Sequence, residues 1–333
     1  MLLSFFFLYY CVFYCMHLFL MCYFCCRPVG SNRYIYLFMK KILLLCAALI
    51  LCGAAAARER GVHRVVSCNI RVPLPQDEES GNGWSVRKEL CREVMKRRKA
   101  DIYCLQEVTV GQYEDMCRMF PCYFVFGYSG PEMDAMPDRE YHGIAKNLVM
   151  FSKKRYEMTG AGVYWLSETP LIGGSEAWGT ARARHVSWVR LRDRRTGREF
   201  RVLSVHLDHI SQEARIAQVR VVLDETGQYP GNIPQVLVGD FNSKPSNPVA
   251  KALTDAGWTD AFIQANGGDT HENSFHQFKG EAYRPKKGKP GRIDFIYLKG
   301  DGLRARASEL VKDRIGGKYP SDHYFLEADV VMK

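Results

Sequence analysis

The stretch Val236-Leu237-Val238-Gly239-Asp240-Phe241-Asn242 sets a pattern that much of the chain repeats. A short, Val-rich apolar run of this kind is typical of a buried strand. A carboxylate directly after such a strand is costly to bury unless a partner or a cation compensates its charge. We therefore predict a strand over 235–240, with Asp240 and Asn242 as candidates for chemistry at its end.

Three other apolar runs lead into an amide or an acid in the same way. They are Val65-Val66-Ser67-Cys68-Asn69, Ile102-Tyr103-Cys104-Leu105-Gln106-Glu107 and Ile293-Asp294-Phe295-Ile296. Two clusters that contain His join them, namely His206-Leu207-Asp208-His209 and Ser321-Asp322-His323. Each cluster alone is more often a strand cap or a satisfied polar group. Together they predict one site that is assembled at strand ends.

Short apolar runs recur along the chain and predict a sheet-rich domain. The strand-like runs cover 63–70, 101–107, 147–152, 185–192, 200–207, 235–240, 292–298 and 324–332. Helices are predicted at 84–98, at 211–226 after a Ser cap, and at 248–256, which Asn-Pro opens and Gly closes. Because strands and helices are interspersed, we expect stacked α and β layers rather than an all-β barrel.

The first 57 residues differ in composition from the rest of the chain. They contain seven of the twelve cysteines and no Asp or Glu. A basic start at Met39-Lys40-Lys41, an apolar run over 42–51 and small residues at 54–57 predict a secretory signal peptide at 39–57. Residues 1–38 are either mis-called upstream translation or an extra membrane segment.

We expect one mature domain, 58–333, that is secreted or periplasmic. Cys52 suggests a lipoprotein anchor, but Leu51 before it is large for such a site. The mature part carries 42 Lys and Arg against 36 Asp and Glu, a far weaker bias than a nucleic-acid-binding stripe. Its five cysteines match no zinc pattern, and Cys117 and Cys122 either form a local disulfide or stay free.

The ordered set of motifs resembles the endonuclease/exonuclease/phosphatase superfamily. The resemblance covers 62–332 and rests on Gly239-Asp240-Phe241-Asn242 followed by Ser321-Asp322-His323. Trp165-Leu166-Ser167-Glu168-Thr169-Pro170, together with His206-Leu207-Asp208-His209 and Arg215, is most similar to secreted bacterial hydrolases of the deadenylase-like branch. The resemblance implies a four-layer α/β/β/α sandwich with two central mixed β-sheets, the deoxyribonuclease-I-like fold. It also implies metal-dependent hydrolysis of phosphate esters.

A metal centre is part of what the resemblance implies. Glu107 would be the principal ligand, aided by Asn69 and Asp322, because Mg²⁺ prefers oxygen ligands from few carboxylates and keeps several waters. Mn²⁺ could take its place. The bound metal would neutralise phosphate charge and stabilise the leaving oxygen.

The resemblance implies that other residues act on the attacking water and on the reacting phosphorus. Asp240 would orient or deprotonate the water, and Asn242 would hydrogen-bond the water or a phosphate oxygen. Asp294 would hold His323, which would act as the base or stabilise the pentavalent phosphorus. His206 would contact the phosphate or assist the leaving group.

Arg184 is expected to bind phosphate, for which its guanidinium fork is suited, unless it forms a surface ion pair. Asp208 and Arg215 are interpreted as a structural pair that supports His206. Some relatives use a catalytic Tyr, and the unplaced candidates in that region are Tyr141, His142 and Asn147.

The loops around the site decide which substrate fits, so the site residues indicate the type of reaction but do not identify the substrate. A basic segment before Asp294 either lines a groove for a polyanion or is a solvated loop; its residues are Lys286, Lys287, Lys289 and Arg292. We expect a monomeric, Mg²⁺-dependent phosphodiesterase, nuclease or phosphatase that acts on nucleic acid, a nucleotide or another phosphate ester. The alternatives are a phospholipid-headgroup hydrolase of the sphingomyelinase type and a non-catalytic binding protein on the same fold.

Overall fold

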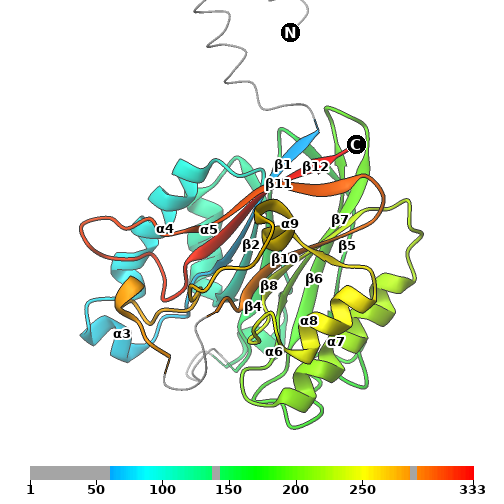
Figure 1. Cartoon of the computed structure of the whole chain (residues 1–333). Helices are drawn as coiled ribbons and strands as arrows, with labels where there is room; N and C mark the ends of the chain where they lie inside the picture. The colour runs from blue at the N-terminus through cyan, green and yellow to red at the C-terminus, as the bar shows by residue number, and fades with distance from the viewer. Residues whose placement is uncertain (1–60, 137–142, 286–290) are drawn as a thin grey trace, which may run out of the picture. The chain divides into compact units, whose positions relative to one another are not determined.

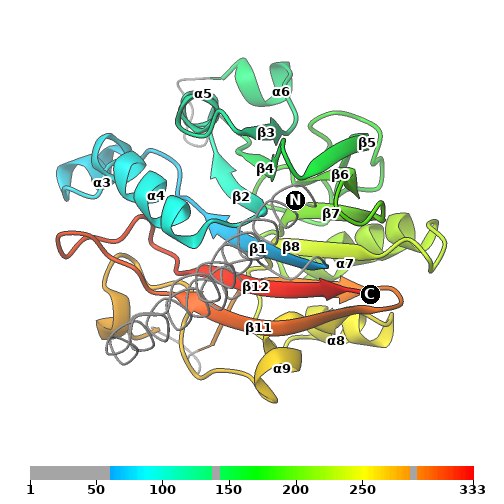
Figure 2. The ribbon, with the colours of Figure 1, turned by 90° about the horizontal axis from the view of Figure 1, so that it is seen from above.

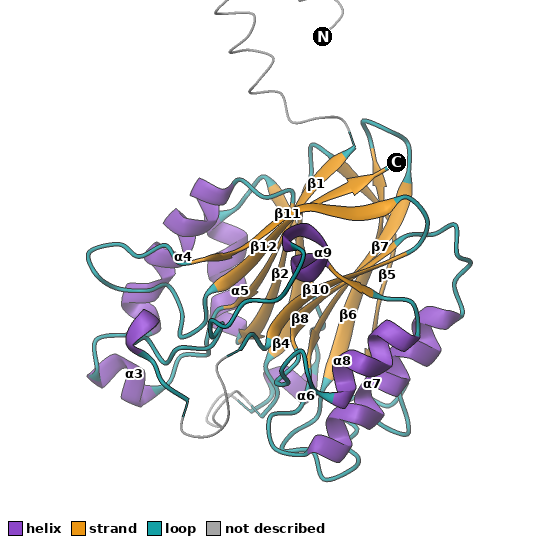
Figure 3. Ribbon diagram, in the orientation of Figure 1, coloured by secondary structure: helices purple, strands orange, loops and turns teal. Residues whose placement is uncertain are grey.

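Two six-stranded sheets form the centre of the computed structural model, which describes residues 61–136, 143–285 and 291–333 (Figures 1 and 3). The first sheet has the spatial order β11 (Leu303–Val311), β12 (Phe325–Met332), β1 (Val62–Asn69), β2 (Ile102–Val108), β4 (Lys146–Ser152), β3 (Tyr123–Phe126). The second has the order β5 (Tyr156–Trp165), β6 (His185–Asp193), β7 (Glu199–His206), β8 (Gln235–Asp240), β10 (Asp294–Lys299), β9 (Thr259–Asp260). Parallel pairs, β1 with β2 and β7 with β8, lie among antiparallel ones, so both sheets are mixed.

Helices cover the outer faces of the two sheets. On one side lie α3 (Pro75–Glu79), α4 (Trp84–Arg98) and α5 (Val110–Met119), and on the other α7 (Gln212–Gly227) and α8 (Pro248–Asp255), as Figures 2 and 3 show. The short elements α6 (Pro131–Asp134), α9 (Ala261–Asn266) and η2 (Gly280–Ala282) belong to the connections. In the described part of the chain, no helix has the length and apolar character needed to cross a membrane.

Alternating side chains of the strands build separate cores. In β8, Val236 and Val238 belong to the core between the sheets, whereas Leu237 packs with Val219 of α7 and Leu253 of α8. β1 and β2 alternate in the same way between the central core and the core beneath α4 and α5. This period of two is expected for strands that are buried on both faces. The predicted four-layer α/β/β/α sandwich is confirmed.

Most predicted elements are present with boundaries shifted by one or two residues. The Ser211 side chain caps α7 by accepting the Ala214 N–H, and Asn247 caps α8 by accepting the Val249 N–H. Four strands were missed, namely β3, β5, β9 and β11. All four lie at sheet edges, where side chains are less buried and the apolar alternation is weaker. The missed helix α5 begins with a capping box between Thr109 and Gln112.

Several sequence-based expectations concern residues that the structure does not describe. The signal peptide at 39–57 and the segment 1–38 lie outside the described residues, as do Tyr141, His142, Lys286, Lys287 and Lys289. The five cysteines among the described residues are free thiols, and Cys117 and Cys122 are exposed.

Candidate active site

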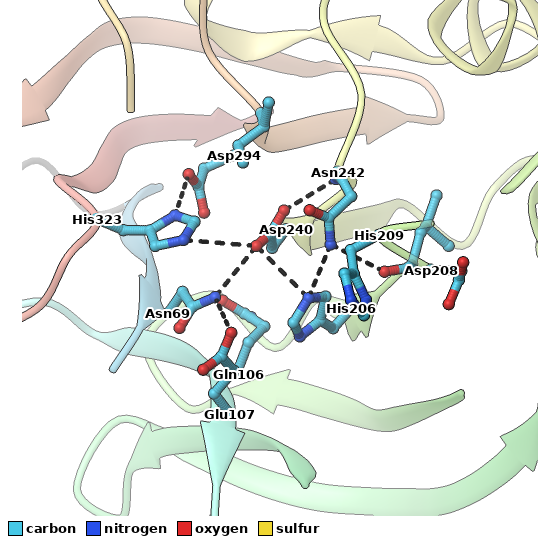
Figure 4. Close-up of polar contacts among 12 residues, drawn as sticks. Asn69, Gln106, Glu107, His206, Asp208, His209, Asp240, Asn242, Asp294 and His323 are labelled. Atoms are coloured by element: carbon cyan, nitrogen blue, oxygen red, sulfur yellow. Dashed lines mark hydrogen bonds and ion pairs between the residues drawn. The ribbon is translucent and has the colours of Figure 1, made fainter. Parts of the chain in front are cut away.

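Strand ends from both sheets meet at one end of the sandwich. The carboxyl ends of β1, β2, β7 and β8 lie there, together with the amino ends of β10 and β12, because β10 runs antiparallel to β8 and β12 antiparallel to β1. In the second sheet, Asp240 is paired with His206 on one side and with Asp294 on the other. The topology therefore gathers polar residues that lie far apart in the sequence (Figure 4).

Asp240 occupies the centre of this cluster. Its Oδ2 accepts a hydrogen bond from Asn69 Nδ2 at 3.1 Å and lies 3.5 Å from His206 Nε2, and its Oδ1 accepts the Asn242 N–H at 2.9 Å (Figure 4). Burial, reinforced by the negative charge of Asp294, raises the pKa of Asp240 to about 7. A carboxylate that titrates near neutral pH is suited to accept a proton from water.

Gly239 explains how Asp240 reaches this position. Its φ is 155°, and a Cβ added there would lie 1.8 Å from the Val205 carbonyl oxygen of the neighbouring strand. Only glycine allows β7 and β8 to approach so closely just before the acid. The Gly-Asp order in the motif is thus a packing requirement as well as a chemical one.

Asp294 and His323 form a buried pair beside Asp240. Asp294 Oδ2 lies 2.9 Å from His323 Nδ1, and His323 Nε2 lies 3.8 Å from Asp240 Oδ2. Burial alone would lower the pKa of His323, but the charge and hydrogen bond of Asp294 outweigh it and raise that pKa to about 10. The ring is therefore a cation at neutral pH. Such a ring suits the stabilisation of negative charge better than the acceptance of a proton.

Of the three predicted metal ligands, Asn69 connects Glu107 with Asp240. Asn69 Nδ2 donates to Glu107 Oε1 at 3.1 Å, and the Val72 N–H donates to Glu107 Oε2 at 3.2 Å. Glu107 has a φ of 61° where the pairing of β2 with β4 is irregular, so its side chain leaves the regular alternation of the strand. Asp322 Oδ2 lies 3.3 Å from Arg71 Nη1.

This side of the site offers hard oxygen atoms to a cation. The carboxylates of Glu107 and Asp322 line the same pocket, and both Glu107 oxygens are oriented by neutral N–H donors. This donor set fits a divalent cation that takes few carboxylates and keeps waters, provided that Arg71 shares or releases Asp322. A second candidate group, Asp240, Asp294 and His323, brings its ligand atoms within 4.8 Å of one another. In that group, the hydrogen bond between His323 Nδ1 and Asp294 Oδ2 already occupies two of the possible ligand atoms.

Arg184 lines the same pocket as these carboxylates. It is 8% exposed, and its Nη2 lies 3.1 Å from Nδ1 of His209. Its Nε lies 3.9 Å from Asp208 Oδ1, and Asp208 already accepts hydrogen bonds from Thr180, Ala181, Ile210 and Ser211. The alternative of a surface ion pair is therefore wrong, because the guanidinium is buried. Burial lowers the pKa of Arg184, which reflects the cost of holding this cation away from water.

Asn242 and His206 complete the wall next to Arg184. Asn242 Nδ2 lies 2.9 Å from His206 Nε2 and donates to the Leu207 carbonyl at 3.0 Å. Burial, with the charges of Arg184 and His323, lowers the pKa of His206 well below its usual value, so the ring is neutral. Neutral His206 can therefore accept the amide proton at Nε2.

A cavity of about 180 Å³ joins these groups. The lining residues are Arg71, Glu107, Arg182, Arg184, His206, His209, Asp240, Asn242, Phe275, Ile293, Asp322 and His323. Sequence reasoning did not assign a role to Arg71, Arg182, His209, Phe275 or Ile293. Arg71 and Arg182 lie two residues from Asn69 and Arg184, so that spacing could have identified them. Phe275 lies in a segment with no periodicity and gave no signal.

Arg215 and Asp208 do contact each other as a structural pair, but Arg215 Nη1 donates to the backbone carbonyl of Asp208 at 2.9 Å rather than to its carboxylate. Two other expectations are corrected by the structure. Asn147 is bonded to the backbone of His185 and does not line the cavity. Arg292 is fully buried and pairs with Asp260 and Asp269, so it cannot line a basic surface groove.

Comparison with known proteins places this site in a family. The model of the Endonuclease/Exonuclease/phosphatase family matches residues 66–323. Nocturnin of Drosophila melanogaster is 22% identical over 276 residues, which cover 74% of this chain and 42% of the relative. The 3'-5'-exoribonuclease subunit Ccr4 of Schizosaccharomyces pombe is 24% identical over 315 residues, which cover 75% and 45%. The chain spans about half the length of the curated relatives it matches.

A solved structure agrees in fold. The mannosyl-6-phosphatase of Bacteroides thetaiotaomicron is 24% identical, superimposes with a TM-score of 0.70, and is matched over 81% of this chain and 100% of its own. The family match includes every predicted site residue from Asn69 to His323. This chain therefore belongs to the endonuclease/exonuclease/phosphatase family.

Proposed function

We propose that this protein hydrolyses phosphate esters with the help of a divalent cation, Mg²⁺ or Mn²⁺. The observation that carries the proposal is the buried guanidinium of Arg184. Among the described residues it has one hydrogen bond, to His209, and its Nε has no hydrogen-bond acceptor. A buried cation with free donors is costly unless a ligand supplies the anion, and a phosphate fits the guanidinium fork.

The surrounding residues supply the chemistry that such a phosphate needs. Asp240 would orient the water and take its proton, and Asn242 would hold the water or a phosphate oxygen. His323, kept cationic by Asp294, would stabilise the charge that develops on the phosphoryl oxygens. His206, neutral and bonded to Asn242, would fix that amide and face the leaving group.

We place the cation at Glu107, with Asn69 and Asp322. The carboxylate oxygens of Glu107 and Asp322, which line the same pocket, support this position, whereas His323 in the alternative group is already held by Asp294. When bound, the cation would neutralise phosphate charge and stabilise the leaving oxygen. Arg71 would then share Asp322 with the metal.

The substrate is proposed by class. Matched relatives include a protein named as a 3'-5'-exoribonuclease subunit, which favours nucleic acid or a nucleotide. A phosphomonoesterase is the second candidate, because the mannosyl-6-phosphatase is matched over its whole length. These relatives give less support to a phospholipid-headgroup hydrolase, and the intact cluster of Glu107, Asp240 and His323 argues against a non-catalytic protein.

Secretion or periplasmic location also remains a proposal. It is supported by the signal-peptide pattern over 39–57. Fractionation of cells that express the full chain tests it. The processed protein should appear outside the cytoplasm, and an unprocessed cytoplasmic product would contradict the proposal.

Purified protein tests the activity. We expect it to hydrolyse bis-(p-nitrophenyl) phosphate or p-nitrophenyl phosphate with Mg²⁺ or Mn²⁺, and to lose this activity in EDTA or in Glu107→Gln. A panel of DNA, RNA, nucleotides, sugar phosphates and sphingomyelin then ranks the substrates. Undiminished activity in EDTA would contradict the metal mechanism, and inactivity on every ester would contradict the function.

A further inference from the structure

The pair formed by Asp294 and His323 connects the two sheets. Asp294 is the first residue of β10 in the second sheet, whereas His323 lies two residues before the start of β12 in the first sheet. Their contact of 2.9 Å therefore depends on how the ends of two separate sheets are held together. Neither sheet ladder alone fixes this distance.

Ser274 lies between these two strand ends and is fully buried. Its Oγ accepts the backbone N–H of Ile293 at 2.9 Å and of Asp294 at 3.2 Å. Its carbonyl oxygen accepts the Tyr324 N–H at 2.8 Å. One residue thus holds the chain at Asp294 through its side chain and the chain beside His323 through its backbone.

The two residues after Ser274 extend this connection. Phe275 forms an antiparallel bridge with His323, and their ring centroids lie 5.1 Å apart. The His276 N–H donates to the Asp322 carbonyl at 2.7 Å. The segment 274–276 therefore acts as a short added strand along 322–324, and the Ser274 hydroxyl ties it to the start of β10.

We propose that Ser274 is a positioning residue that sets the contact between Asp294 and His323 by accepting the N–H groups of residues 293 and 294. The proposal rests on the proposed function, because the pair is assigned a role in phosphoester hydrolysis. Removal of the hydroxyl deprives two backbone N–H groups of their acceptor at the point where Asp294 leaves the loop. The carboxylate then shifts relative to the imidazole, whose distance to Asp240 changes with it.

Kinetics of single and double variants test this role. Ser274→Ala is expected to lower kcat by about 10 to 100-fold, the loss typical of a small misplacement, with KM changed less than about twofold. Ser274→Thr, which keeps a hydroxyl, should retain most of the activity. In a His323→Ala background, Ser274→Ala should change kcat less than about twofold, because the group that it positions is gone.

Ser308→Ala is the matched control. Ser308 is also buried and bonds a backbone group, the Glu327 carbonyl, but lies in β11 and does not line the cavity. It should leave kcat unchanged. Equal losses from Ser274→Ala with and without His323, or an equal loss in Ser308→Ala, would reduce Ser274 to a general structural role. If Ser274→Ala does not fold, Ser274→Cys is used in its place, because the thiol is of similar size but a weaker hydrogen-bond acceptor. The same results are expected.

Proton NMR separates this proposal from the proposed function. The His323 Nδ1–H bonded to Asp294 should resonate far downfield in the wild-type protein and in Ser308→Ala, and should shift upfield or broaden in Ser274→Ala. This readout needs no catalysis. A wild-type protein that is inactive on every ester would contradict the proposed function alone, whereas an unchanged resonance in Ser274→Ala would overturn the role of Ser274.

Discussion

Replacement of Arg184 by Met should remove activity without loss of stability. The guanidinium is buried. Within the described part of the chain it makes one hydrogen bond, to His209, and lies 3.9 Å from Asp208 Oδ1, so the fold gains little from its charge. Burial lowers its pKa, which indicates that burying this charge costs free energy. We expect the free energy of unfolding to stay within about 1 kcal/mol of the wild type or to rise.

The loss of activity can be estimated from the contacts that Arg184 would make with phosphate. A charged hydrogen bond contributes about 1.5 to 3 kcal/mol, and a fork can make two. Removal of both corresponds to about 3 to 6 kcal/mol, so kcat/KM should fall by roughly 10² to 10⁴-fold. The assay is hydrolysis of a p-nitrophenyl phosphate ester, with urea unfolding of the same protein samples.

Arg201→Met is the matched control for this prediction. Arg201 is fully buried, and two of its nitrogens have partners, with Nη2 2.7 Å from Glu225 and Nη1 3.0 Å from Gln235. Its removal breaks a partly buried pair and should cost up to about 3 to 5 kcal/mol of stability while kcat/KM stays unchanged. If Arg184→Met instead unfolds as easily as Arg201→Met and keeps full activity, the reasoning is refuted.

Three further predictions follow from the same site and core. Added Mn²⁺ should raise the Tm of the wild type in a thermal shift assay but have little effect on Glu107→Gln; an equal rise in both would remove Glu107 from the metal site. Asp240→Asn should lower kcat by at least about 10²-fold without loss of stability, because the Asp240 charge is disfavoured by burial and by Asp294; unchanged turnover would remove Asp240 from the chemistry. Burial, with the charges of Lys146 and Arg184, lowers the pKa of His185 to about 3. Below about pH 6.5 the unfolded chain therefore binds a proton at His185 that the folded protein does not bind. The free energy of unfolding should fall accordingly as the pH decreases from 6.5 toward 3. Between pH 7 and pH 5 this amounts to about 2 kcal/mol, and urea unfolding of His185→Gln should show a correspondingly weaker dependence on pH.

The chemistry was easier to predict than the geometry that supports it. Asp240, Asp294 and His323 each follow or precede a strand that the apolar pattern predicts, and the topology then brings them together. The edge strands β3, β5, β9 and β11 were missed because a strand with one free edge buries fewer side chains. Their absence from the prediction did not affect the site, which lies at the ends of interior strands.

Other parts of the site depend on contacts that no local pattern contains. Ser274 and Phe275 lie in a stretch without periodicity, and their importance arises from pairing with residues about fifty positions later. Asp208 and Arg215 form the structural pair that charge suggested, but charge alone did not show which atom accepts. Arg215 bonds the Asp208 backbone carbonyl, because backbone N–H groups and Thr180 already satisfy the carboxylate. Sequence patterns indicate which groups are costly to bury, but only the fold shows which partner satisfies each of them.

The most direct test of the account is a crystal structure of the protein soaked with Mn²⁺ and inorganic phosphate, with anomalous data to locate the metal. We predict a Mn²⁺ peak bound by Glu107 and a phosphate within hydrogen-bond distance of Arg184. Mn²⁺ held instead by Asp240, Asp294 and His323, or a pocket that binds neither ion, would contradict it.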